Sequence, residues 1–289
     1  MRNTVAWEIK MLLVRIAFCL AASTLATLAA AAPIIISIGG DDNPSSIQAT
    51  VDVFRSILGG PNNGNNPGPI AGGRREINWD GGGSTLTTSP VTPFNVFQNT
   101  RGALVTTPGV GLSQATPDGL ATLFSNPTYA TTFNPFSPQR LFVPVASNVI
   151  DVLFFLPGSN GAEAASVSGF GAVFSDVDLA GPTSISYFDP EGDLLYSKSV
   201  ETGSVADGSL SFLGVFFNAG ERIARVRIVT GNAALGPNES GSIDVVAMDD
   251  FLYSEPVALS ASVPEPSTLA LLALCALALL GMRQVRMRT

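Results

Sequence analysis

The stretch "TSISYFDPEGDLLYSKSV" (residues 183–200) indicates the fold class of this chain. Two short runs, 183–188 and 194–200, flank a tight connection in which Pro190 and Gly192 supply a turn. Short strands joined by tight turns are typical of antiparallel sheets, because such strands need no long crossover. We therefore predict a β-hairpin here.

Similar runs lie on both sides of this hairpin, at 140–145, 149–156, 169–179, 210–217, 222–230 and 242–253. In the run 222–230 the apolar Ala224, Val226 and Ile228 alternate with Arg225 and Arg227, which indicates a half-buried antiparallel strand. Short strands at close spacing, without long helices, predict a mainly β fold. We expect an antiparallel β-sandwich or jelly roll over residues 74–254.

Residues 32–73 precede this domain and include one predicted short helix, at about 46–58. Ser45 and Gln48 have the spacing of a capping box. Apolar residues fall on one helical face, at Ile47, Val51, Phe54 and Leu58. The segment "GGPNNGNNPGPIAGG" (59–73) is turn-rich and predicts a flexible loop or linker.

Residues 1–31 have the three parts of a secretory signal peptide. Arg2, Lys10 and Arg15 form a basic head, and residues 16–28 form an apolar stretch. Ala29 and Ala31 are the small residues that signal peptidase requires, so we expect cleavage after Ala31. The alternative is an uncleaved membrane anchor.

The C-terminal end begins with a predicted linker at 255–263 and contains the unbroken apolar run "LALLALCALALLGM" (269–282). Counting from Pro266 to Met282 gives 17 residues, the lower end of the range that can span a membrane as a helix. Three arginines follow at once and would remain in the cytoplasm: Arg283, Arg286 and Arg288. We therefore predict one C-terminal transmembrane helix, with the body of the protein outside.

The order of motif, apolar helix and basic cluster in this tail resembles the PEP-CTERM sorting signal. Its motif is Val263-Pro264-Glu265-Pro266, and the signal occupies residues 264–289. The two prolines keep the motif extended, as a processing enzyme would require. The resemblance implies recognition and cleavage by an exosortase in a bacterium that exports polysaccharide. It also implies an inner-membrane precursor that becomes a cell-surface or extracellular protein associated with biofilm matrix.

The stretch from "GFGAVFSDVDL" through "ERIARVRI" to "VVAMDDFLY" resembles the extracellular module that often precedes such tails. This resemblance implies a jelly-roll, galactose-binding-like domain. No motif in the stretch fixes a ligand.

Composition narrows the chemistry that the body could perform. The chain has no histidine, and its two cysteines, Cys19 and Cys275, lie in the terminal segments. Histidine-dependent triads and thiol nucleophiles are therefore excluded from residues 32–263. The chain has 15 basic and 23 acidic residues, and the two terminal segments, 1–31 and 264–289, together contain six of the basic and two of the acidic ones. The body between them therefore has 9 basic and 21 acidic residues, a net charge near −12. Such a charge repels nucleic acid, so we expect no nucleic-acid partner.

Acidic residues suggest a calcium site, because calcium prefers hard oxygen ligands. The candidate ligands are Asp249 and Asp250, with Asp176 and Asp178, which the alternation of a strand would place on one side. In the resembled modules a last-strand acid often holds a structural calcium ion. The alternative is that these carboxylates cap turns and solvate strand edges.

Trp79 in "NWDGG" is the candidate for stacking against a sugar, and the alternative is an ordinary core tryptophan. We expect a non-catalytic structural or adhesive role in the extracellular matrix. The main rival is a carbohydrate-binding module for the exported polysaccharide. A glycosidase using two carboxylates is a third interpretation.

Overall fold

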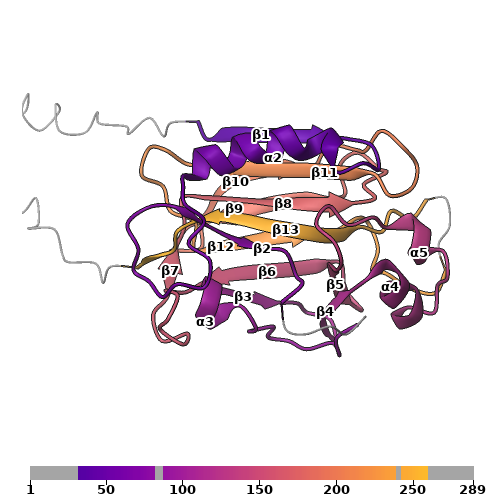
Figure 1. Cartoon of the computed structure of the whole chain (residues 1–289), viewed down its shortest axis with the longest axis horizontal. Coiled ribbons are helices and arrows are strands. Elements are labelled where there is room, and N and C mark those ends of the chain that lie inside the picture. The colour runs from indigo at the N-terminus through magenta and orange to yellow at the C-terminus, as the bar shows by residue number, and fades with distance from the viewer. Residues whose placement is uncertain (1–31, 82–86, 239–241, 260–289) are drawn as a thin grey trace, which may run out of the picture.

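The computed structural model of the protein describes residues 32–81, 87–238 and 242–259. Within these ranges the fold is mainly β, as predicted, and its two large antiparallel sheets form a sandwich (Figure 1). The seven-stranded sheet has the order β1 (Ile34–Gly39), β11 (Leu210–Phe216), β8 (Gly169–Ser175), β13 (Ala247–Ser254), β5 (Leu141–Val145) and β4 (Gly111–Ala115), and β2 (Arg74–Ile77) also pairs with β13. The five-stranded sheet has the order β10 (Leu194–Ser199), β9 (Ser184–Phe188), β12 (Arg225–Val229), β6 (Val149–Phe154) and β3 (Ala103–Thr106). A small ladder joins β14 (Val257–Ala258) to β7 (Ala165–Ser166).

The predicted hairpin at 183–200 is confirmed as β9 and β10. Its turn is closed by the backbone N–H of Asp193, which donates to Asp189 Oδ1 at 2.8 Å. Gly192 has a φ of +91°, in the left-handed region that glycine adopts without steric cost.

This hairpin is the tip of a long folded ribbon. Moving outward from the turn, β9 pairs with β10, β8 with β11, β6 with β12, and β5 with β13. Successive pairs alternate between the five-stranded and the seven-stranded sheet. The four pairs thus form one ribbon that is folded across both sheets.

The core lies between the two sheets and receives side chains from both. Phe170 and Phe251 enter from the seven-stranded sheet, and Ile150, Val226 and Ile228 enter from the five-stranded sheet. The predicted alternation in β12 is confirmed, because Val226 and Ile228 are fully buried while their arginine neighbours are not. Burial of large aromatic and branched side chains is the main favourable term for such a sandwich.

Helix α2 (Ser45–Leu58) packs on the outer face of the seven-stranded sheet, above β1 and β11 (Figure 1). It agrees with the predicted helix to within one residue, and the four predicted apolar residues are its buried ones. The predicted capping box is wrong, since the N-cap is Pro44 and the N–H of Ser45 donates to Asn43 Oδ1 at 3.0 Å. Three shorter helices, α3 (Gln98–Arg101), α4 (Pro117–Leu123) and α5 (Tyr129–Thr132), complete the set that the structure describes.

The sandwich extends beyond the predicted limits 74–254 at both ends. Strand β1 pairs with β11 and so brings residues 34–39 into the seven-stranded sheet. The 59–73 loop is held against the body, where Asn63 is buried and Gly68 N donates to Pro157 O at 2.6 Å. The predicted linker at 255–263 begins with the buried Glu255 and the strand β14. The described chain begins and ends at the same end of the sandwich (Figure 1).

The predicted signal peptide and the predicted transmembrane helix lie outside the described residues. Among the helices that the structure does describe, none has the length and apolar character needed to cross a membrane.

Candidate functional site

Asp249 and Asp250 lie in a β-bulge of β13. Met248 is opposite Phe174 of β8 and Phe251 is opposite Ala172, so three steps on β13 match two on β8. Both Met248 and Phe251 belong to the core between the sheets. In a regular strand, residues three apart point to opposite faces. The bulge resolves this conflict and leaves both aspartates to face away from that core.

The two aspartates share a hydrogen-bonded site with Ser137. Asp249 Oδ2 accepts the backbone N–H of Phe136 at 2.6 Å and that of Ser137 at 3.0 Å. The Ser137 hydroxyl contacts both carboxyl groups, at Asp250 Oδ1 and at Asp249 Oδ1. The loop before β5 is thereby fixed to the last long strand.

Burial raises the pKa of Asp249 well above its usual range, and the neighbouring charge of Asp250 raises it further. Burial also raises the pKa of Asp250, while hydrogen bonds from Ser137 and Asp249 oppose that shift. The two carboxyl groups therefore influence each other's protonation, and the pKa of the fully buried Asp249 shows the stronger rise.

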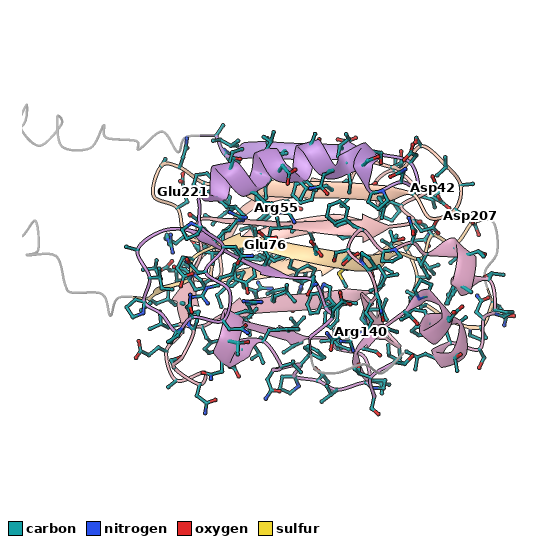
Figure 2. All side chains as sticks on the ribbon, viewed as in Figure 1. Asp42, Arg55, Glu76, Arg140, Asp207 and Glu221 are labelled. Atoms are coloured by element: carbon teal, nitrogen blue, oxygen red, sulfur yellow. The ribbon has the colours of Figure 1, made fainter. Side chains whose placement is uncertain are left out.

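A layer of charged side chains covers this pair. Arg55 of α2 lies 3.0 Å from Glu76 Oε2 and 3.5 Å from Asp250 Oδ2. Arg74 donates to the other oxygen of Glu76 at 2.6 Å. Figure 2 shows Arg55 and Glu76 side by side over the seven-stranded sheet. The network connects α2, β2 and β13.

The pair has almost no contact with solvent. Asp249 is fully buried and Asp250 is 3% exposed, so a substrate has no direct access to the carboxyl groups. Across residues 32–81, 87–238 and 242–259, no group of three or more His, Cys, Asp or Glu side chains has a geometry that could hold a metal ion. N–H donors already use the Asp249 carboxylate, and the Arg55 guanidinium lies beside Asp250. A calcium ion here would have to displace these partners, and calcium binding stays a prediction.

Asp176 and Asp178 lie in different surroundings from the bulge pair. Strand β8 ends at Ser175, and Asp176 has a φ of +72°. Asp176 is buried and accepts the N–H of Gly208 at 3.2 Å, whereas Asp178 is exposed and donates its backbone N–H to Asp244 Oδ1 at 3.1 Å. The prediction that both face one side of a strand is wrong, because the left-handed residue ends the extended backbone. Burial, aided by Asp178, raises the pKa of Asp176 to about 8.

Trp79 is a core residue in this structure and has no exposed surface. Its ring stacks on Phe142 with centroids 3.7 Å apart, and the Phe251 ring meets it edge-on at 4.8 Å. Its indole N–H donates to the carbonyl of Asp249 at 2.9 Å. The structure does not agree with the predicted sugar-stacking role, because aromatic side chains surround the ring that a sugar would need.

Several residues of these networks were not among the sequence predictions. Ser137 lies in a loop with no motif, and Arg55 and Glu76 are distant in sequence from β13. Arg75 and Glu255, which form a fully buried ion pair, were missed for the same reason. A signal was present in "RREI" (74–77), where three charged residues precede one apolar residue, but the partner of Arg75 could not be named from spacing.

Comparison with known families adds one finding. Residues 262–286 match the family model of the PEP-CTERM protein-sorting motif. The match includes the predicted motif residues Val263–Pro266 and the arginines Arg283 and Arg286, all outside the described residues. It indicates exosortase-dependent sorting of an exported protein. Neither curated proteins nor solved structures gave a match.

Proposed function

We propose that this protein is an exported precursor whose β-sandwich is delivered to the cell surface or extracellular matrix by its PEP-CTERM tail. The observation that carries the proposal is the family match at residues 262–286. In the proposed sequence of events, signal peptidase removes residues 1–31, and an exosortase in the inner membrane cuts near Pro264–Pro266. A single C-terminal helix holds the precursor in the membrane until that cut.

The geometry of the folded domain supports this order. The described chain enters and leaves at the same end of the sandwich, so both membrane-directed ends can face one membrane (Figure 1). Strand β14 ends at Ala258, only four residues before the matched segment starts. The folded body would thus stand close to the membrane surface, with an extended motif at its base.

For the body we propose a non-catalytic structural or adhesive role in a jelly roll. The ribbon of four successive strand pairs, wrapped into two sheets, supports the jelly-roll assignment. The absence of histidine and cysteine from residues 32–263 supports the non-catalytic assignment. The burial of the Asp249–Asp250 pair supports it further.

The second candidate function is binding of the exported polysaccharide. The observation in its favour is a polar row on the outer face of the five-stranded sheet. There Asp151 accepts hydrogen bonds from Arg225 at 3.0 Å and from Arg227 at 2.8 and 2.9 Å. The Arg225 guanidinium also lies 3.8 Å from the centroid of the Phe188 ring. A glycan array decides between the two roles. Glycan binding that is lost in Arg227→Ala favours a carbohydrate-binding module, and no binding to any glycan favours the structural role.

The sorting proposal is tested by variants of the motif in a host that contains the exosortase. Replacing Pro264, Glu265 and Pro266 together by alanine should leave the protein in the membrane fraction with its tail attached. Ser267→Ala, directly after the motif, is the matched control and should be processed normally. Normal release of the triple variant would overturn the proposal.

A further inference from the structure

The strand edges of the sandwich differ in how they are protected. An unprotected edge offers unpaired N–H and C=O groups to another strand, so proteins cover edges or disrupt them with bulges and charges. Strand β4 is covered by bridges from Thr87 and Val91, and β3 by a bridge from Phe94. Strand β10 has a register irregularity between Leu194 and Tyr196 and carries Lys198.

Strand β1 has none of these protections in its N-terminal half. It pairs with β11 in continuous register over six residues and stands at the end of the sheet order. Its sequence, "IIISIG", contains no charge, no proline and no bulge. Among the described residues, the segment 201–204 approaches the C-terminal half of β1, where Ser204 N donates to Gly40 O at 2.8 Å and Ser37 contacts Glu201. Alternate residues of such a strand direct their backbone groups outward, where a further strand could pair.

An open, shallow groove of about 420 Å³, with both polar and apolar lining, lies between β1 and α2. It is lined by Ile35, Ile36, Ser37, Ala49, Thr50 and Val53. Ile35 is 38% exposed and Val53 is 50% exposed, so both elements that line the groove carry a large exposed apolar side chain. The groove residues are uncharged, although the body carries a net charge near −12.

Two acidic side chains near the groove are paired with basic ones. Asp52 is paired with Arg55 at 2.9 Å, and Glu201 with Lys198 at 3.5 Å. These two ion pairs lessen the repulsion that a second copy would meet along β1, and Asp41 and Asp42 lie beyond the C-terminal end of the strand.

We propose that β1 and the adjoining groove form a self-association surface, on which a second copy of this chain adds its own β1 in antiparallel register. A partner for this edge must itself supply an apolar strand with an unpaired edge, and β1 is such a strand. Two-fold antiparallel pairing places the same groove on both sides of the contact, and it joins two seven-stranded sheets into one.

The chain's own ends leave little that could cover the edge instead. After the predicted cleavages, only Ala32 and Pro33 precede β1, and only a few residues remain after Leu259. The proposal uses these predicted cleavages, and it goes beyond the structural role by naming the contact between copies.

The test is a cysteine scan in the full chain, expressed on cells, with Cys19 and Cys275 replaced by alanine. Single cysteines at Ile34, Ile35, Ile36, Ser37 and Ile38 are oxidised and examined on non-reducing gels. We expect the yield of disulfide-linked dimer to be highest at one position, or at two positions on either side of the two-fold axis. In antiparallel two-fold pairing, only residues near the axis face the same residue of the other copy. Leu194→Cys on the edge strand β10, which is 57% exposed, should give no dimer.

A charge variant provides the second measurement. Ile35→Lys should lower the dimer fraction about tenfold or more, because two like charges would face each other across the contact. Leu194→Lys is its control, and protease resistance shows that both variants remain folded. Higher ionic strength should raise the dimer fraction of the unmodified protein by screening its net charge.

Three results would overturn the proposal. The β1 thiols could react freely with maleimide but give no dimer, or they could be inaccessible to maleimide in a protein that is monomeric. The third result is a disulfide-linked product whose mass is not that of two copies of this chain. The scan is repeated in cells without exosortase. If dimers still form there while the tail is retained, self-association does not depend on sorting. Failure of one proposal can therefore be distinguished from failure of the other.

Discussion

Arg75 and Glu255, which are 180 residues apart in the chain, form an ion pair through two hydrogen bonds of 2.6 Å each. Both side chains are buried, at 0% and 2% exposure. Asn63 adds a third hydrogen bond to Glu255 at 2.8 Å, and Arg75 also donates to the carbonyls of Gly64 and Thr100. This pair holds the 59–73 loop and the end of β13 together, immediately before the chain leaves the sandwich.

Arg75→Met should lower the free energy of unfolding by about 3–5 kcal/mol, because it leaves the Glu255 carboxylate buried without its partner. Chemical denaturation of the exported protein measures this loss. The matched control is Arg227→Met on the surface, where an exposed ion pair contributes about 1 kcal/mol or less. Equal, small losses in both variants would contradict the account of a buried clamp.

Asp176→Asn should reduce the pH dependence of stability. Burial raises the pKa of Asp176 from an ordinary value of 3.8 to about 8 in the folded protein. Between these values the folded protein holds a proton that the unfolded chain has released, so the free energy of unfolding decreases as pH rises. One such group contributes a slope of at most about 1.4 kcal/mol per pH unit.

Asparagine tolerates the left-handed backbone of residue 176 and mimics the protonated carboxyl group. Denaturation curves at pH 5 and pH 8 should therefore differ less in this variant than in the unmodified protein. Asp118→Asn, at an exposed position, should leave the difference unchanged. An undiminished pH effect in Asp176→Asn would rule out this residue as its source.

Gly214→Ala should loosen α2 from the seven-stranded sheet. Gly214 lies opposite Gly171 on the neighbouring strand, and a Cβ at residue 214 would stand 2.7 Å from the Phe54 ring of α2. Overpacking of this kind costs about 1–3 kcal/mol. Thermal melting measures the loss, and Gly236→Ala is the control because a Cβ there meets no atom within 4 Å. A melting temperature unchanged in both variants would mean that the ring moves aside freely.

The fold could be predicted where periodicity alone decides it. The four apolar residues of α2 and the alternation in β12 were correct because one buried face imposes a fixed spacing. The Asp189–Gly192 turn was predictable from its proline and glycine. Strand β1 was missed, since six residues beside a predicted signal peptide show no alternation.

The candidate site was predicted less well, because its geometry depends on contacts distant in sequence. The apolar pattern around "MDDF" implies a bulge only once Met248 and Phe251 are known to face the same core. Trp79 enters the core through a stack on Phe142, which lies in another strand. Asp178 was separated from Asp176 by a left-handed backbone that alternation cannot reveal.

The central claim is that the tail is a sorting signal that is removed, and the intact mass of the surface-exposed or released protein tests it most directly. The account predicts an N-terminus at Ala32 and the loss of the chain beyond about Pro264 or Pro266. A mature protein that still carries "LALLALCALALLGM" (269–282) would contradict it and leave a plain membrane anchor.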